Sequence, residues 1–129
     1  MAWDNSANAG FTSGTPWLKM GSRHKEINLE RDLASDKSIF RFHKHLFALR
    51  REREELRQGE FIPLHKAEDN FAAYLRVLDG RSTCIVCNFD GERRIDLPEM
   101  QGRILLSNYG RQGGDEGVFR PYEIAVFGI

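Results

Sequence analysis

The 129-residue chain lacks the features that direct a protein to nucleic acid, to a membrane or to secretion. Its 19 basic and 19 acidic residues give a formal net charge of zero, and no block of like charge interrupts the balance. We therefore expect no long-range attraction to nucleic acid or to an anionic membrane surface. No apolar run approaches the roughly 20 residues that span a bilayer, and the start MAWDNS lacks the basic and apolar regions of a secretory signal. These absences favour a soluble, cytoplasmic protein.

Cysteine is also scarce, with one pair in the run Cys84-Ile85-Val86-Cys87. Residues three apart in a strand point to opposite faces of the sheet, so these thiols could neither bridge nor hold one metal together. The β-rich surroundings offer no helix N-terminus to lower a thiol pKa, as redox motifs require. We expect two buried, reduced core cysteines.

Two other short motifs also give no metal or cofactor site. His43 and His45 lie two apart on a predicted helix, where they project roughly 200° from one another. The glycine-rich run GRQGGDEG is followed by strand-forming residues, whereas a phosphate cradle needs a helix start there. The run is therefore predicted to be a hairpin loop, and no cofactor is expected.

The first twenty residues, MAWDNSANAGFTSGTPWLKM, are polar and rich in Gly, Asn and Ser, yet they carry Trp3 and Trp17. Loops this long are uncommon in compact domains and tend to line sites. Aromatic faces beside Asp4 and Asn8 could stack on a sugar and bind its hydroxyls, but the same residue types also anchor a loop to a core. From residue type alone, packing is favoured over ligand binding.

A long helix is predicted after an extended stretch at Glu26–Glu30, with Ser35 or Asp36 as its N-cap. Its apolar stripe covers about half of the circumference, which is broader than one small sheet requires. We therefore expect the helix to pack from two directions, and the isolated chain to self-associate through residues 36–56. The stripe consists of Ile39, Phe40, Phe42, Leu46, Phe47 and Leu49.

Everything after Gln58-Gly59 alternates in the manner of an antiparallel β-sandwich. Asp79-Gly80 and Asp90-Gly91 are hairpin signals, and no helical segment intervenes to join parallel strands. The remaining turns are expected at AEDN, PEMQG and GRQGGDEG. The predicted strands are Gly59–Lys66, Phe71–Leu78, Ser82–Phe89, Arg93–Leu97, Arg103–Tyr109 and Val118–Phe127.

These residues carry a resemblance to a known family. The opening segment followed by EINLE resembles the stretch near the end of the catalytic barrel in the α-amylase superfamily, glycoside hydrolase family 13. It is most similar to the oligo-1,6-glucosidase, dextran glucosidase and trehalose-6-phosphate hydrolase branch. SIFRFHKHLFALRRE resembles the last barrel helix of that family, and Ile85–Phe89, LLSNYG and RPYEIAVF resemble strands of its C-terminal sandwich. The matching positions in the opening segment are Met1, Trp3, Asp4, Asn8, Ala9, Gly10, Phe11, Pro16 and Trp17.

The resemblance implies the C-terminal part of a retaining α-glucosidase. Residues 1–57 would be the last loop and helix of an incomplete (β/α)8 barrel, and residues 58–129 the sandwich that follows. The family's nucleophile, acid/base and sugar-gripping carboxylates lie on earlier barrel loops, so no catalytic residue is expected here. Trp3 and Asp4 would lie on the rim of the substrate pocket. Ala2 stands where many relatives carry Gln, which leaves the preferred linkage open.

Two other classes of function remain possible from the sequence. One is a free-standing carbohydrate-binding sandwich that uses Trp3 and Trp17, and the other is an interaction module without a ligand. In the enzyme reading, the oligosaccharide substrate is bound through the missing barrel, and the 129 residues alone are inactive. The reading frame before Met1 discriminates among the three.

Overall fold

The computed structural model describes residues 1–65, 70–112 and 117–129. The chain divides into two compact units, Met1–Lys44 and His45–Ile129, with the boundary inside helix α2 (Ile39–Glu52). The predicted strand end at Lys66 lies outside the described residues, as do most of the AEDN turn and the middle of GRQGGDEG. None of the helices in the described parts has the length and apolar character needed to cross a bilayer.

The first unit contains a short helix, α1 (Leu29–Ala34), where part of an extended stretch was expected. The prediction for Glu26–Glu30 is therefore wrong. Asn28 has an extended backbone, and its side-chain oxygen accepts the N–H of Arg31 at 3.0 Å. This N-cap satisfies one of the free donors of the first turn and starts the helix one residue later.

Helix α2 begins at Ile39, so the predicted cap at Ser35 or Asp36 is also wrong. Ser38 is the N-cap, and its hydroxyl oxygen accepts the N–H of Arg41 at 3.1 Å. The carboxylate of Asp32 adds to this cap and accepts the backbone N–H of Ile39 at 2.9 Å and that of the next residue at 3.0 Å. It also accepts the hydroxyl of Ser38 at 2.6 Å. The Ser38 hydroxyl and the two amides hold the pKa of Asp32 below its ordinary value. A carboxylate from the preceding helix thus accepts the first two free N–H groups of α2.

The second unit opens with a break in the predicted single helix. After α2, the chain turns at Arg53 and forms a separate short helix, α3 (Glu55–Gln58). The carboxylate of Glu55, which is 1% exposed, accepts the Arg53 Nε at 2.5 Å and the Thr83 hydroxyl at 2.8 Å. Burial raises the pKa of Glu55, but bonds from Thr83 and Arg53 outweigh it and hold the pKa below its usual range. This cluster connects the helix break to strand β3 (Arg81–Asn88).

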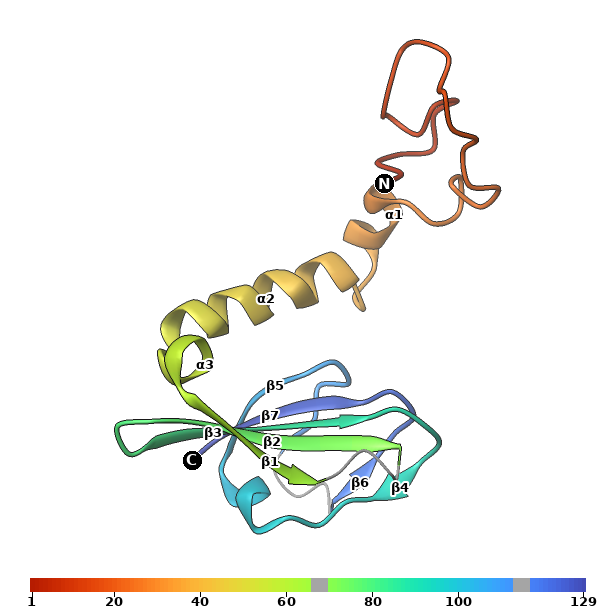
Figure 1. Ribbon diagram of the computed structural model, residues 1–129. Helices are drawn as coiled ribbons and strands as arrows, with labels where there is room; N and C mark the ends of the chain where they lie inside the picture. Colours follow the sequence, from red (N-terminus) through yellow and green to blue (C-terminus); the bar gives the residue numbers. More distant parts are fainter. Residues whose placement is uncertain (66–69, 113–116) are drawn as a thin grey trace. The chain divides into compact units, whose positions relative to one another are not determined.

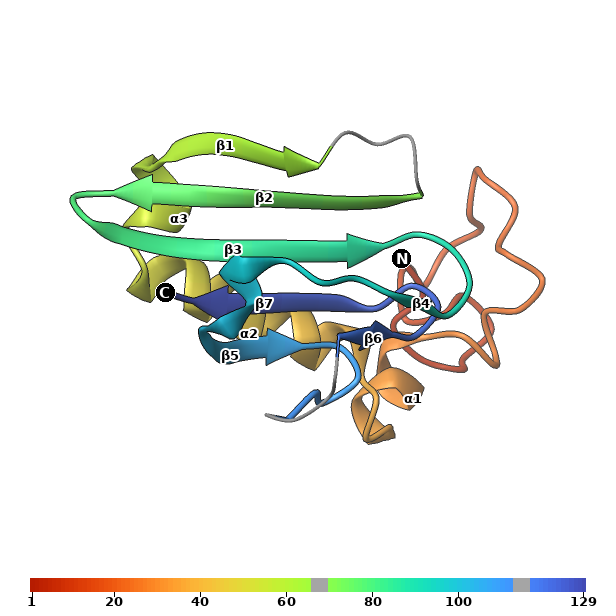
Figure 2. The ribbon, with the colours of Figure 1, turned by 90° about the horizontal axis from the view of Figure 1, so that it is seen from below.

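The remaining chain is mainly antiparallel β-structure, which confirms the predicted fold class (Figure 1). A five-stranded sheet has the order β1-β2-β3-β7-β5, which Figure 2 shows from below, and a two-stranded sheet pairs β4 with β6. A 3₁₀ helix at Pro98–Gln101 replaces the expected PEMQG turn. The strands are β1 (Glu60–His65), β2 (Phe71–Leu78), β3 (Arg81–Asn88), β4 (Arg93–Arg94), β5 (Arg103–Ser107), β6 (Val118–Phe119) and β7 (Ile124–Gly128).

The two Asp-Gly signals have different outcomes. Asp79 and Gly80 both have positive φ, 49° and 78°, and join β2 to β3 in a tight hairpin as predicted. Asp90-Gly91 joins β3 to β4, which belong to different sheets, so the hairpin predicted there is wrong. The Asn88 carboxamide donates to the carbonyls of Asp90 and Gly91 and guides the chain from one sheet to the other.

One predicted strand, Val118–Phe127, is divided in two. The chain turns between Arg120 and Glu123, where the N–H of Glu123 donates to the Arg120 carbonyl at 3.2 Å. Pro121 has no N–H to give to a ladder, and Tyr122 has a positive φ of 58°. The turn therefore separates β6 from β7 and places them in different sheets.

Both edge strands of the five-stranded sheet are irregular. The register between β1 and β2 shifts between Pro63 and His65. On the opposite edge, the register between β5 and β7 shifts between Ile104 and Leu106. The pairings of β2, β3 and β7 in the centre of the sheet run without such a shift.

The core lies on one face of the large sheet and includes residues of both sheets, as in a sandwich. Cys84 belongs to this core and is fully buried, and burial raises the pKa of its thiol to about 12. Cys87 is reduced as well but only partly buried, so the expectation of two buried cysteines holds for Cys84 alone. The core residues are Phe71, Ala73, Cys84, Val86, Ile95, Phe119, Ala125 and Phe127.

A buried ion pair stabilises the connection between β6 and β7. Arg111 Nε donates to Glu123 Oε1 at 2.8 Å, and both side chains are 3% exposed. The guanidinium also donates to the Val118 carbonyl and lies over the Phe119 ring, 4.1 Å from its centroid. The second carboxylate oxygen of Glu123 accepts the N–H of Arg120 at 2.8 Å. Neither charge is therefore left without hydrogen bonds.

Candidate functional site

Both backbone polar groups of Trp3 are hydrogen-bonded within the first unit. The N–H of Trp3 donates to the carbonyl of Ala9 at 2.9 Å, and its carbonyl accepts the N–H of Glu30 at 2.9 Å. Ala9 is fully buried and has a positive φ of 52°. The two residues expected on a pocket rim, Trp3 and Asp4, thus lie on a loop that is fixed to itself and to the start of α1.

The Asp4 carboxylate is organised by one neighbouring residue. The N–H of Ser6 donates to Asp4 Oδ1 at 2.9 Å, and the Ser6 hydroxyl donates to the same oxygen at 2.5 Å. These bonds lower the pKa of Asp4, the side-chain bond more than the backbone bond, so the group is ionised at neutral pH. Ser6 was not among the residues named from the sequence, although an Asp followed two residues later by Ser indicates such a turn.

The rest of the loop is shaped by Asn8. Its carboxamide donates to the carbonyls of Thr12 and Gly14, both at 2.9 Å. The chain beyond borders a hollow of about 700 Å³, lined among others by Phe11, Trp17 and His24. Trp17 is 89% exposed, so its ring does not anchor the loop to a core within this chain.

The first unit has almost no apolar core. Within residues 1–44, Ala9 is the one hydrophobic residue that is fully buried, while Asn28 and Ser38 are buried polar groups. A second, mainly apolar hollow of about 420 Å³ is bordered by Ile39 and Phe40. The unit is held by hydrogen bonds, and eight of its large apolar side chains are exposed. These exposed side chains are Met1, Trp3, Phe11, Trp17, Leu18, Ile27, Ile39 and Phe40.

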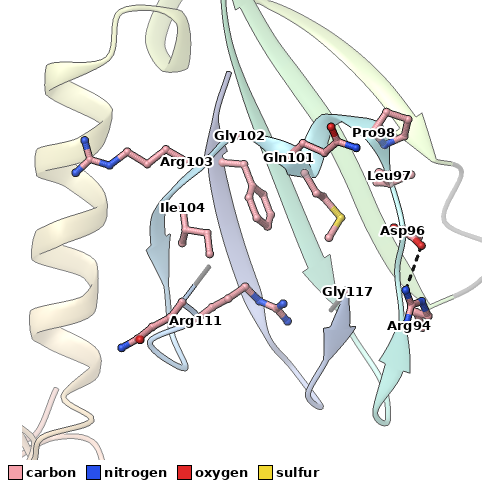
Figure 3. Close-up of a pocket in the computed structure, with 13 residues that line it drawn as sticks. Arg94, Asp96, Leu97, Pro98, Gln101, Gly102, Arg103, Ile104, Arg111 and Gly117 are labelled. Carbon is pink, nitrogen blue, oxygen red and sulfur yellow. Dashed lines mark hydrogen bonds and ion pairs between the residues drawn. The ribbon is translucent and has the colours of Figure 1, made fainter. Parts of the chain in front are cut away.

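The second unit contains a groove of about 1160 Å³ (Figure 3). Arg94 and Asp96 form an exposed ion pair at its edge, with 3.5 Å between Arg94 Nη2 and Asp96 Oδ2. Arg111, which also lines the groove, is bound to Glu123. Asp96 is the single carboxylate among the described lining residues, so the groove does not supply the paired carboxyls of glycoside hydrolysis.

The remaining sequence candidates are not brought together. His43 Nδ1 lies 2.9 Å from the carbonyl of Ile39, one turn earlier on its own helix. Cys84 and Cys87 occupy opposite faces of β3, as predicted from their spacing. Across residues 1–65, 70–112 and 117–129, no three His, Cys, Asp or Glu side chains are grouped so as to hold a metal ion.

Comparison with known proteins assigns this architecture. A family model described as the α-amylase catalytic domain matches residues 1–59. Across 98% of its length, the chain is 35% identical to an oligo-1,6-glucosidase from Heyndrickxia coagulans. The chain therefore resembles α-amylase-family enzymes over nearly its whole length, and the family model itself covers its first 59 residues. The chain is also 32% identical, over 97% of its length, to the trehalose-6-phosphate hydrolase of Bacillus subtilis strain 168.

Solved structures of two similar enzymes have the same fold. The chain superposes on trehalulose synthase MutB from Pseudomonas mesoacidophila MX-45 with a TM-score of 0.88 at 30% identity, covering 98% of the chain. It superposes on the trehalose-6-phosphate hydrolase of Bacillus licheniformis with a TM-score of 0.84, also at 30% identity and 98% coverage. The chain spans 23% to 24% of the length of these relatives. It thus matches about a quarter of a longer α-amylase-family enzyme.

Proposed function

We propose that the chain is the C-terminal part of a retaining α-glucosidase that hydrolyses α-glucosidic bonds, chiefly α-1,6 bonds, in short oligosaccharides. The observation that supports this proposal is a difference in coverage: the match includes nearly all of this chain but only a small part of the related enzyme. Nearly the whole chain is similar to an oligo-1,6-glucosidase, while it accounts for 23% of that enzyme. The remaining three quarters would supply the catalytic pocket.

Within such an enzyme, residues 1–57 would be the last loop and helix of the (β/α)8 barrel, and residues 58–129 the C-terminal sandwich. The extent of the family match supports this division, because it ends at residue 59, one residue before β1 begins. The boundary between the two compact units lies earlier, after Lys44, because it is set by contacts within this chain alone.

The chain itself would be non-catalytic. Retaining hydrolysis needs two carboxyl groups about 5 Å apart across the scissile bond. Barrel enzymes assemble such groups from several strand ends, and one loop with one helix supplies too few. Asp4 is the acidic residue that the family resemblance places near the pocket, where it and Trp3 would bind sugar at the rim.

The exposed apolar residues of the first unit support the presence of more protein around it. Hydrophobic side chains of this size each stabilise a structure by roughly 1.5–3 kcal/mol when fully buried, so a segment that exposes eight of them would gain from a neighbour. In the longer enzyme the neighbour would be the rest of the barrel. The free thiols of Cys84 and Cys87 fit a reducing cytoplasm.

The test is to express the chain alone and in its full upstream reading frame, and to assay both with isomaltose and an aryl α-glucoside. We expect turnover from the longer protein and none above background from the 129 residues. Turnover by the purified chain that disappears in Asp4→Asn would contradict the non-catalytic role. A native start at Met1, with no upstream barrel, would remove the enzyme proposal.

The exposed ring of Trp17 favours a second candidate, a free-standing carbohydrate-binding module. Calorimetric titration of the 129-residue chain with isomalto-oligosaccharides distinguishes the two. Saturable binding by the chain alone that is lost in Trp17→Ala would favour the module.

A further inference from the structure

The opening loop contains a closed set of hydrogen bonds around Asp4. Ser6 donates twice to Asp4 Oδ1, and its hydroxyl oxygen in turn accepts the N–H of Gly10 at 2.9 Å. The carbonyl of Ser6 accepts the N–H of Ala9 at 3.0 Å. One serine therefore links the carboxylate to the backbone on the far side of the turn.

The two carboxylate oxygens of Asp4 are not equivalent. Oδ1 accepts both bonds from Ser6, whereas Oδ2 has no hydrogen-bond partner among the described residues. Oδ2 lies over Gly10, where an added Cβ would be 2.6 Å away, a distance that real Cβ contacts do not reach. Gly10 also has a positive φ of 65°, which favours glycine. Because residue 10 is a glycine, the turn has space for Oδ2 of Asp4 beside it.

We propose that Ser6 and Gly10 are positioning residues that turn Oδ2 of Asp4 toward the substrate as an acceptor for a sugar hydroxyl. This inference rests on the proposed function, in which Asp4 lies on the pocket rim. Ser6 engages Oδ1 and fixes the plane of the carboxylate, and Gly10 keeps the space beside Oδ2 free. A carboxylate oxygen held in this way binds a hydroxyl without first losing rotational freedom. Trp3, the residue before Asp4, has its backbone held by Ala9 and Glu30 and has an exposed side chain.

The experiment uses the full-length enzyme and a set of α-glucosides that each lack one hydroxyl. A bond from a substrate hydroxyl to a charged acceptor contributes enough that Asp4→Asn should lower kcat/KM on the order of 10- to 100-fold on the intact substrate. Ser6→Ala should lower it by about 3- to 10-fold, because the carboxylate remains but is no longer held. Both penalties should disappear on the deoxy substrate that lacks the contacted hydroxyl.

Two control variants separate positioning from general damage to the loop. Ser6→Thr keeps the hydroxyl and should restore most of the activity lost in Ser6→Ala. Ser13→Ala removes an exposed serine of the same loop that makes no hydrogen bond to the described residues, and it should leave kcat/KM unchanged. Loss of folding would affect every substrate equally, so the substrate dependence distinguishes a positioning role from a structural one.

The outcomes are distinct. Penalties that are equal on every deoxy substrate would overturn the inference while leaving the α-glucosidase proposal intact. The same holds if Ser6→Ala changes kcat/KM no more than Ser13→Ala does. A wild-type longer protein that hydrolyses none of the α-glucosides would instead overturn the proposed function, and the inference with it.

Discussion

The buried pair of Arg111 and Glu123 gives the sharpest test of what stabilises the sandwich. Changing Glu123 to Gln removes the charge that faces a guanidinium with 3% exposure. It also places an amide N–H₂ where one carboxylate oxygen accepts the N–H of Arg120. Removing one partner of a buried ion pair costs about 3–5 kcal/mol, because the other charge stays buried. Since small domains are stable by about 5–15 kcal/mol, the loss would be a large part of the total.

Urea unfolding followed by circular dichroism measures the change. With a slope of about 1–3 kcal/mol per molar urea, the midpoint should fall by at least about 1 M. Asp96→Asn is the matched control, because the Arg94–Asp96 pair has side chains 60% and 78% exposed. An exposed pair contributes about 0–1 kcal/mol, so the control should barely move the midpoint.

A double variant, Arg111→Met with Glu123→Gln, keeps an apolar stem over Phe119 and removes both charges. We expect it to recover at least half of the stability lost in the single variant, because no charge remains buried. The reasoning is refuted if Glu123→Gln costs no more than Asp96→Asn. It is also refuted if the double variant is less stable than Glu123→Gln alone.

Three further predictions follow from exposure and charge. In the native chain, Cys87 should react with a thiol reagent before Cys84, whose pKa is about 12, and intact mass should show no disulfide; faster labelling of Cys84 would contradict the burial. The lowered pKa of Asp32 adds stability that is present above its ordinary value of 3.8 and is lost as the pH falls through the folded pKa; acid titration of Asp32→Asn should show a smaller loss over that range, and an unchanged profile would count against it. Light scattering over a concentration series should reveal self-association of the 129-residue chain, reduced by polar substitutions at Phe40 and Phe47; a monomer unaffected by these changes would show that the stripe needs no cover.

Much of the sheet was predictable because its signals are local. Strand β2 has the predicted bounds, since its apolar residues end in an Asp79-Gly80 turn whose backbone angles only such residues adopt easily. The hairpin predicted from the same dipeptide at Asp90-Gly91 is absent, because the Asn88 side chain binds the carbonyls there and directs the chain to another sheet. A two-residue signal contains no information about such a side chain.

The helix boundaries were predicted less well than the strands. The start of α2 is set by the Ser38 hydroxyl, a local N-cap beyond the predicted Ser35 and Asp36, together with the Asp32 carboxylate seven residues before Ile39. The contribution of Asp32 is beyond the reach of a local N-cap rule. In the candidate site, Trp3 and Asp4 could be named from the resemblance. The roles proposed for Ser6 and Gly10 could not be predicted from the sequence, because they depend on which carboxylate oxygen of Asp4 is already bonded.

The irregular edge strands limit how this protein can associate. An edge strand with regular spacing presents free N–H and C=O groups to which another chain can add a strand. On β1 the proline lacks that donor, and the register shifts of β1 and β5 break the even spacing at both edges. Association through the exposed apolar side chains should therefore give compact oligomers or amorphous aggregates, and not fibrils that grow strand by strand.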